Sequence, residues 1–202
     1  MNTSHKSEKQ NIRKFLIDRR NELSSEYELK NNSHIHIKTL LEDIGKCKIG
    51  SYFPFRNEIS TKLIHELLFS LEFEISLPCV NDEDQNLIFR NWKTNDDLVK
   101  NKYSILQPKD DAIEDYPEMI IVPLVGFSMS GYRLGYGGGY YDRFIGAKNK
   151  SGKIITVGFG YTFQEVNDLP IESHDQKLNW ILTEKYLYNC LLYTSPSPRD
   201  RV

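Results

Sequence analysis

Apolar side chains in the first part of the chain recur every three or four residues, which is the spacing of one helix face. Residues 6–23 carry them at Ile12, Phe15, Leu16 and Leu23. We therefore expect the chain to open with a helix over residues 6–23, packed on the protein through this apolar stripe.

Two further helices are predicted from their boundary residues. Ser25 and Glu28 have the spacing of a capping box, which favours a second helix over about residues 25–44, ended by the glycine that follows. Ser60 can cap a third helix over residues 60–71, where four leucines form an apolar stripe.

Short apolar runs bounded by turn residues predict strands at residues 48–55, 73–80, 87–92, 119–125, 154–160 and 180–183. The run MIIVPLV at 119–125 is apolar throughout, which is typical of a strand buried on both faces. Residues 93–118 are acidic and weakly patterned, and we expect a solvated loop there.

The order of these elements favours one fold class. Strands alternate with helices, including a short helix predicted over residues 140–147, so we expect an α/β fold. It would be a single layered domain with a mainly parallel central sheet flanked by helices and a glycine-rich loop after a central strand. In such sheets ligands bind beyond the carboxyl ends of the strands, which is where that loop falls.

Composition narrows the class of protein. The 202 residues suffice for one domain with a core, and 39% apolar and 27% charged residues are ordinary for a globular protein. A formal net charge of −2 argues against a general nucleic-acid binder. No stretch approaches the roughly 20 apolar residues of a membrane span, and the polar first ten residues do not resemble a secretory signal.

The cysteines and the last residues bear on location and domain limits. Cys47, Cys79 and Cys190 lack metal-ligand spacing and indicate free thiols in a reducing cytoplasm. The eleven residues 190–200, CLLYTSPSPRD, match the translation of a transposase-based sequencing adapter in one frame. We expect a domain over residues 1–189, cut short there, with residues 190–202 as non-structural read-through. A natural Ser/Pro-rich tail is the alternative.

Seven of the twelve glycines fall between Gly126 and Gly146. The centre of this segment reads RLGYGGGYYDR, from Arg133 to Arg143. Glycine permits tight turns and close approach of the backbone to a ligand, and a helix N-terminus adds partial positive charge. The segment is therefore a candidate phosphate cradle.

Two familiar phosphate-binding motifs do not fit this segment. No Gly-Lys-Ser/Thr closes it as in a Walker A loop, and a Rossmann fingerprint would need glycine at Tyr140. A floppy surface loop is the structural alternative. The strand before it, the helix after it and its flanking arginines favour an anion or nucleotide site.

The same segment resembles the signature of the 5-formyltetrahydrofolate cyclo-ligase family, also called methenyltetrahydrofolate synthetase. The resemblance extends to weaker motifs, and these are Lys9-x-x-x-Arg13, residues 49–59, Phe89-Arg-x-Trp92 and Glu172-x-His-Asp175. It covers nearly the whole chain to about Glu184. It implies a small enzyme that uses ATP and Mg²⁺ to convert 5-formyltetrahydrofolate into 5,10-methenyltetrahydrofolate with release of ADP and phosphate.

The resemblance also assigns residues to ATP. Those implicated are Lys9, Gln10, Asn11, Ile12, Arg13, Arg133, Leu134, Gly135, Tyr136, Gly137, Gly138, Gly139, Tyr140 and Tyr141. Arg133 and Tyr140 are the candidate catalytic residues, and Arg133 could neutralise phosphate charge. From the residues alone, Lys9 and Arg13 could equally be a solvated basic face and Arg133 a loop-bracing ion pair.

Metal and folate contacts follow from the resemblance in the same way. Asp142 and Asp175 are the candidate Mg²⁺ ligands, although Asp142 could simply favour a helix dipole. The candidate folate-contacting residues are Phe53, Glu58, Trp92 and Tyr136, with Trp92 equally compatible with plain core. Ser128 and Asn179 stand where the family often has acids.

The reaction that the resemblance implies requires no nucleophilic side chain. The formyl oxygen attacks the ATP γ-phosphorus, N10 of the folate attacks the activated carbon, and phosphate departs. We expect small-molecule partners, no nucleic acid, no membrane, and a monomer. Two alternatives stay open at this stage: a non-catalytic relative that binds nucleotide, folate or RNA, and another ATP-using transferase on a similar sheet.

Overall fold

The structure is a computed structural model that describes residues 2–81, 86–152 and 154–192. Its helices are α1 (Asn2–Glu28), α2 (Ser33–Ile44), α3 (Lys62–Ser70), α4 (Tyr140–Ser151) and the short 3₁₀ helix η1 (Thr162–Gln164). Its strands are β1 (Ile49–Gly50), β2 (Ile75–Val80), β3 (Leu87–Trp92), β4 (Leu98–Lys100), β5 (Leu106–Pro108), β6 (Glu114–Asp115), β7 (Met119–Pro123), β8 (Gly126–Phe127), β9 (Arg133–Leu134), β10 (Ile155–Phe159), β11 (Trp180–Leu182) and β12 (Leu187–Asn189).

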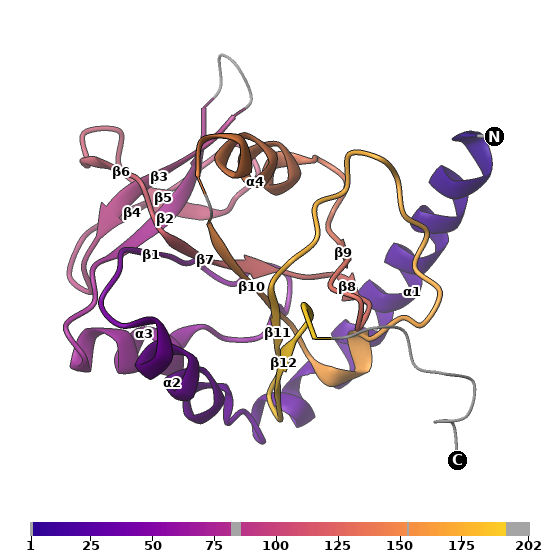
Figure 1. Cartoon of the computed structure of the whole chain (residues 1–202), viewed down its shortest axis with the longest axis horizontal. Helices are drawn as coiled ribbons and strands as arrows, with labels where there is room; N and C mark the ends of the chain where they lie inside the picture. The colour runs from indigo at the N-terminus through magenta and orange to yellow at the C-terminus, as the bar shows by residue number, and fades with distance from the viewer. Residues whose placement is uncertain (1, 82–85, 153, 193–202) are drawn as a thin grey trace.

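The central sheet runs β12-β11-β10-β7-β1-β2-β3-β6 within the described residues. The five inner strands, from β11 to β2, are parallel, and the antiparallel pairs lie at the two edges. The predicted α/β class with a mainly parallel sheet is confirmed. Figure 1 shows α4 over one face of the sheet, α2 and α3 over the other, and α1 along one side.

Strand β7 contributes side chains to the hydrophobic cores on both faces of the sheet. Met119 and Ile121 belong to the core shared with α2 and α3, whereas Ile120 and Val122 belong to the core under α4. All four side chains are fully buried. The continuous apolar run therefore marks a strand buried on both faces, as predicted, because alternate side chains of a strand point to opposite faces.

The predicted capping box at the start of the second helix is wrong. Helix α1 runs through Ser25 to Glu28, and α2 begins only at Ser33. The Glu28 carboxylate instead accepts hydrogen bonds from the Ser60 N–H at 3.1 Å and the Tyr161 hydroxyl at 2.9 Å. Its other oxygen accepts from the nearby Asn31 amide at 2.9 Å, but Ser60 and Tyr161 are distant in sequence, so local spacing could not identify them.

Other expectations need smaller corrections. The strand predicted over residues 48–55 is only the two residues of β1, and α3 begins at Lys62, whose N–H bonds the Ser60 hydroxyl at 3.2 Å. Residues 93–118 are not one solvated loop, because β4, β5 and β6 lie there. Asp115 of β6 is buried and pairs with Lys48 at 2.6 Å.

The C-terminal boundary stays a prediction, since residues 193–202 lie outside the described part of the chain. Up to there, Cys190 is buried and its N–H donates to the Asn179 carbonyl at 2.9 Å, while Leu191 and Leu192 are exposed. Packing thus extends one residue past the expected limit at Asn189.

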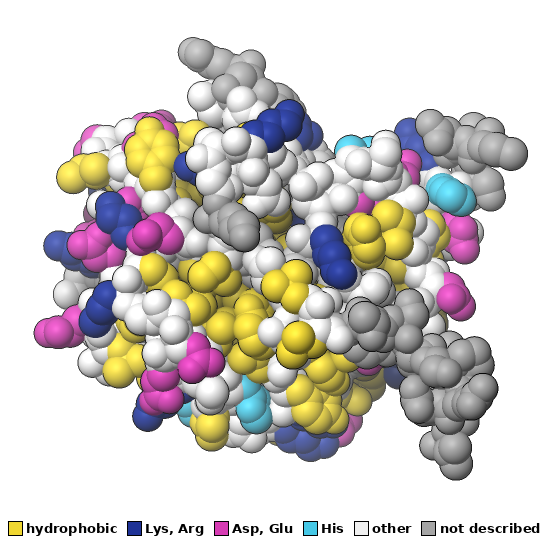
Figure 2. Space-filling view, viewed as in Figure 1, with side chains coloured by type: hydrophobic (Ala, Val, Ile, Leu, Met, Phe, Trp, Pro, Cys, Tyr) yellow, Lys and Arg dark blue, Asp and Glu magenta, His cyan; other side chains and the backbone are white. Residues whose placement is uncertain are grey.

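The molecular surface carries both signs of charge. Figure 2 shows lysine and arginine side chains interspersed with aspartate and glutamate on the face seen in Figure 1, in line with the small net charge of −2. Among the described residues, none of the helices is both long and apolar enough to cross a membrane.

Candidate active site

Helix α1 presents a row of buried side chains to the loops beside the sheet. Lys9, Leu16 and Arg20 are at most 4% exposed, and Arg13 lies in the same row. Their spacing of three or four residues puts them on one helix face. Gly126 of β8 allows the close approach, because a Cβ there would lie 2.6 Å from the Leu16 side chain.

Lys9 ties the start of α1 to the loop before β11. Its ammonium donates to the Glu172 carboxylate at 2.7 Å and to the Asp175 carboxylate at 2.6 Å. The hydrogen bond and charge of Lys9 lower the pKa of Glu172. Lys9 is therefore not part of a solvated basic face.

Arg13 holds the glycine-rich loop one turn further along the helix. Its Nε donates to the Gly135 carbonyl at 2.7 Å, and its guanidinium carbon would lie 3.7 Å from a Cβ at Gly137. Burial lowers the pKa of Arg13, an effect that the charges of Glu172 and Asp175 oppose. The motif Lys9-x-x-x-Arg13 thus joins two loops that are far apart in sequence.

The loop from Gly135 to Gly139 needs glycine for its shape. Gly137 has φ 102° and Gly139 has φ 68°, both in the left-handed region that favours glycine. A Cβ at Gly138 would lie 2.6 Å from the Tyr140 ring. Gly139 precedes the first residue of α4, so the loop leads directly into a helix N-terminus, whose partial positive charge favours an anion.

Arg133 and Asp142 connect the two ends of this loop. Arg133 Nη2 donates to Asp142 Oδ2 at 2.7 Å, and the other oxygen of Asp142 accepts the Gln176 N–H at 3.2 Å. The latter bond places the loop that carries Asp175 beside the start of α4. Arg133 is 8% exposed and Tyr140 is partly exposed.

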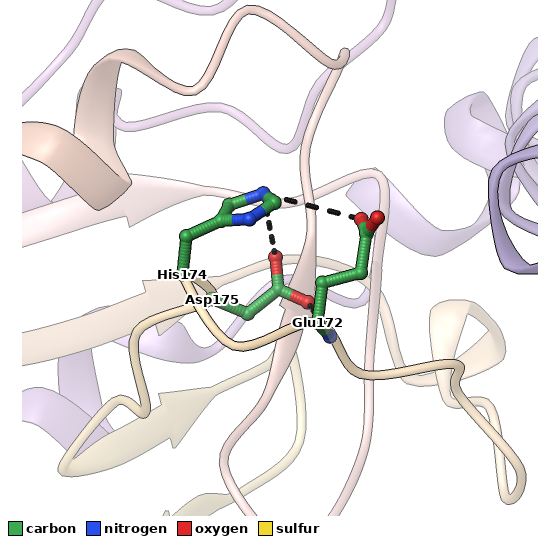
Figure 3. A group of neighbouring side chains, drawn as sticks. All are labelled: Glu172, His174 and Asp175. Carbon is green, nitrogen blue, oxygen red and sulfur yellow. Dashed lines mark hydrogen bonds and ion pairs between the residues drawn. The ribbon is translucent and has the colours of Figure 1, made fainter. Parts of the chain in front are cut away.

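The second candidate metal ligand belongs to a small cluster. Figure 3 shows Glu172, His174 and Asp175 turned toward one another, with His174 Nε2 at 3.9 Å from Glu172 and 3.8 Å from Asp175. Each could offer a ligand atom to one cation. Carboxylate oxygens suit Mg²⁺, so Asp142 and Asp175 fit a metal site by their chemistry. In this structure each is paired with a cation, Asp142 with Arg133 and Asp175 with Lys9, which a metal ion would have to displace in part.

Glu58 is a buried carboxylate beside the loop. It accepts the Phe55 N–H at 2.8 Å and interacts electrostatically with the Tyr136 hydroxyl. Burial raises the pKa of Glu58 to about 7, against the opposing effects of the Phe55 N–H, the Arg20 charge and Tyr136. A carboxyl group in this setting can accept hydrogen bonds from a ligand and change its charge near neutral pH.

Phe53 and Trp92 lie together on the α3 side of the sheet. Their ring centroids are 5.4 Å apart and edge-to-face, and His65 contacts both rings. Trp92 is only 6% exposed, so it backs Phe53 from within the core. The position of Trp92 leaves its predicted contact with a ligand a hypothesis.

A cleft of about 600 Å³ opens beyond the end of β2. It is lined in part by Arg90, Lys100, Lys102 and Tyr103, and the Tyr103 hydroxyl lies 2.9 Å from that of Tyr140. The cleft therefore adjoins the glycine-rich loop. Sequence reasoning placed Lys100, Lys102 and Tyr103 in a loop and missed them, because their stretch carries no motif.

Some predicted residues stand apart from this arrangement. Gln10 and Asn11 are exposed on the other side of α1, whereas Ile12 is partly buried beside the row, three residues after Lys9 and four before Leu16. Leu134 is buried in β9, where it pairs with Gly126.

The two departures from the family pattern have structural partners. The Ser128 hydroxyl lies 2.8 Å from that of Ser130, and Asn179 Oδ1 accepts the Thr156 N–H at 2.8 Å. Asn179 thereby joins β10 to the segment before β11. Neither residue touches Arg133, Asp142 or Asp175 through a hydrogen bond described in the structure.

Comparison with known proteins identifies similar chains. The model of the 5-formyltetrahydrofolate cyclo-ligase family matches residues 5–184. A 5-formyltetrahydrofolate cyclo-ligase of Haemophilus influenzae is 34% identical over 153 residues, covering 73% of this chain and 81% of the relative. One from Escherichia coli K12 is 32% identical over 140 residues, covering 67% and 76%.

Solved structures agree in fold. The NMR structure of an Aquifex aeolicus 5,10-methenyltetrahydrofolate synthetase has a TM-score of 0.75 at 26% identity, covering 96% of this chain and 98% of that one. A Mycoplasma pneumoniae 5,10-methenyltetrahydrofolate synthetase has a TM-score of 0.67 at 23% identity, covering 87% and 98%, which bears on the fold alone.

Proposed function

Because this chain belongs to the 5-formyltetrahydrofolate cyclo-ligase family, an enzyme family of the ligase class, we propose that it closes a ring on 5-formyltetrahydrofolate with consumption of ATP. The products are 5,10-methenyltetrahydrofolate, ADP and phosphate. The observation that carries the proposal is the glycine-rich loop, held between Arg13 and Arg133 and followed at once by Asp142.

ATP occupies the loop in this proposal. The N-terminus of α4, with the positive end of its dipole, and the guanidinium of Arg133 face the phosphates, and Lys9 and Arg13 add positive charge from α1. Asp142 and Asp175 hold Mg²⁺, which offsets phosphate charge during transfer. Tyr140, with its hydroxyl next to Tyr103, borders the phosphates on the cleft side.

The folate lies between the loop and the cleft. Glu58 accepts hydrogen bonds from the N–H groups of the folate ring system. Phe53 and Tyr136 pack their rings against it, and Trp92 supports Phe53 from the core. Folates carry glutamate carboxylates. Asp110 also lines the cleft and pairs with Arg90 at 2.6 Å, so Lys100 and Lys102 are the cations that suit that end of the substrate.

The chemistry places few demands on the protein's side chains. The formyl oxygen takes the γ-phosphoryl group, N10 forms the new carbon–nitrogen bond, and the carbon–oxygen bond breaks as phosphate leaves. The protein positions the reactants and offsets charge. We also infer small-molecule partners, with ATP and reduced formylfolate as substrates, in the cytoplasm. The monomeric state and the lack of nucleic-acid partners remain predictions.

One absorbance assay tests this function. Protein mixed with 5-formyltetrahydrofolate, ATP and MgCl₂ is expected to produce the methenyl chromophore with one ADP released per ring closed. Omitting ATP, or replacing it with a β,γ-imido analogue, should abolish the signal. Folded protein that gives no chromophore with excess Mg²⁺-ATP would refute the proposal, and chelation of Mg²⁺ without effect would refute its metal dependence.

A further inference from the structure

Arg20 is a buried cation that sequence reasoning did not single out. It lies on α1, seven residues after Arg13, and is 0% exposed. Its Nη1 donates to the Leu124 carbonyl at 3.3 Å, and its Nη2 donates to the Tyr136 hydroxyl. Its guanidinium carbon lies 5.6 Å from the centre of the Tyr136 ring.

A guanidinium in this position needs a compensating interaction, because a charge removed from water loses its hydration. Within the described part of the chain, no carboxylate lies within ion-pair distance of Arg20. The acid on which its charge acts is Glu58, and the Tyr136 hydroxyl, which accepts the Arg20 hydrogen bond, also lies near enough to Glu58 to lower its pKa. Arg20, Tyr136 and Glu58 thus form a chain from α1 through the glycine-rich loop to the folate side of the site.

Each member of this chain comes from a different part of the sequence. Arg20 is on α1, Tyr136 is in the glycine-rich loop, and Glu58 is in the connection from β1 to α3. Tyr136 is 41% exposed, so packing alone does not fix its ring, and the bond to Arg20 supplies the restraint. Arg19, its neighbour, is exposed and lies over the rings of Phe15 and Phe163 instead.

We propose that Arg20 is a positioning residue of this enzyme: its guanidinium fixes Tyr136 and, through Tyr136, the Glu58 carboxylate, so that the nucleotide loop and the folate pocket hold one arrangement. The role rests on the proposed function, since it assumes that Glu58 contacts the folate. It extends that function to a residue that touches neither substrate.

The effect of removing Arg20 on the pKa of Glu58 depends on the other groups that face this carboxyl group. They are Arg20 from α1, Tyr136 from the loop, Tyr52 after β1, and Tyr141 from α4. Arg20 is the cation among them, and its charge lowers the pKa of Glu58 against the effect of burial. Without it the pKa of Glu58 rises, and the carboxylate form that accepts hydrogen bonds is lost at a higher pH.

The test compares Arg20→Met with Arg20→Lys and with the matched control Arg19→Met. The pKa of Glu58 is measured directly by NMR titration of protein with ¹³C-labelled glutamate, with the Glu58 signal assigned from Glu58→Gln. In Arg20→Met we expect the pKa of Glu58 to be raised by about one unit, which is a tenfold change in its acid dissociation constant. The carboxylate fraction of Glu58 at pH 7 then falls about fivefold, so the KM for 5-formyltetrahydrofolate at pH 7 should rise by about fivefold, more than the KM for ATP, and recover at higher pH.

Arg20→Lys should restore part of the effect because it keeps a charge, and Arg19→Met should resemble the wild type. If Arg20→Met does not fold, Tyr136→Phe removes the bridging hydroxyl and should also raise the pKa of Glu58. An unchanged pKa of Glu58 in folded Arg20→Met or Tyr136→Phe would overturn the proposal. An inactive wild type with the pKa change in place would instead refute the proposed function alone.

Discussion

The guanidinium of Arg133 and the carboxylate of Asp142 are joined at 2.7 Å, one before and one after the glycine-rich loop. Both side chains are mostly buried, at 5% and 16% exposure. The group proposed to meet phosphate and the group proposed to meet Mg²⁺ are therefore each other's partner in this structure. In our proposal, a metal–phosphate complex that enters between Arg133 and Asp142 would replace this one ion pair with two, Arg133 with phosphate and Asp142 with the metal.

Asp142→Asn tests this relationship through the metal. The substitution keeps the shape but removes the charge that would attract the cation, so more Mg²⁺ should be needed for half-maximal rate. We expect kcat to fall by about a hundredfold, the range seen when one stabilising group is removed from a transition state. The measurement is a Mg²⁺ titration of the chromophore assay, with the exposed Asp168→Asn as control. Superimposable titrations of Asp142→Asn and wild type would exclude Asp142 as a ligand.

Lys9→Met should weaken nucleotide binding. Lys9 is the cation that holds Glu172 and Asp175 together, and without it two neighbouring carboxylates repel each other and the incoming phosphates. We expect the KM for ATP to rise by about tenfold, equivalent to one charge-assisted hydrogen bond. Lys14→Met, on the exposed side of the same helix, is the matched control. Equal KM values for the two variants would mean that Lys9 has a structural role only.

Gly137→Ala should distort the glycine-rich loop and leave the packing of the hydrophobic core unchanged. A Cβ at φ 102° is strained by about 1–3 kcal/mol, so the loop must shift away from the contacts that Arg13 makes. The expected result is a raised KM for ATP with a small fall in melting temperature. Gly152→Ala is the control, because Gly152 ends α4 at φ 165° and a Cβ there meets no atom within 4 Å. A Gly137→Ala enzyme with wild-type KM would show that the loop shape is not needed.

The burial of His65 leads us to predict how the stability of the folded protein depends on pH. Its Nε2 lies 2.7 Å from the Ser51 hydroxyl, and burial lowers the pKa of His65 from 6.5 to about 4. Between these two pH values the unfolded chain therefore binds a proton at His65 that the folded protein does not bind. The stability from neutral His65 is complete above pH 6.5 and is lost as pH falls toward 4, by at most about 1.4 kcal/mol per pH unit.

The check on His65 is urea unfolding at pH 7.5, 6 and 5 for wild type, His65→Gln and the control His36→Gln. His65→Gln should be less stable at pH 7.5 but lose less stability on acidification than the other two. Parallel losses in all three proteins would assign the acid sensitivity to other groups.

Much of the architecture followed from the sequence alone, because its signals are local. The period of apolar residues predicted α1, α3 and the strands β2, β3, β7 and β10, and the unbroken apolar run of β7 identified its burial on both faces. The glycine spacing predicted a tight loop entering a helix, and Gly137 and Gly139 have the positive φ values that only glycine adopts easily. Backbone conformation and one-face burial are properties that a short window of sequence specifies.

Tertiary structure alone decided which polar groups meet. Glu28 matched a local capping box, yet its partners Ser60 and Tyr161 come from elsewhere in the chain. Lys9 reaches Asp175, and Arg20 reaches Glu58 only through Tyr136, because the sheet brings three loops to one side of α1. No periodic pattern in the sequence indicates which residue a charged side chain will pair with. Its burial and its partner follow from packing, which is why Arg20 could be found only in the folded molecule.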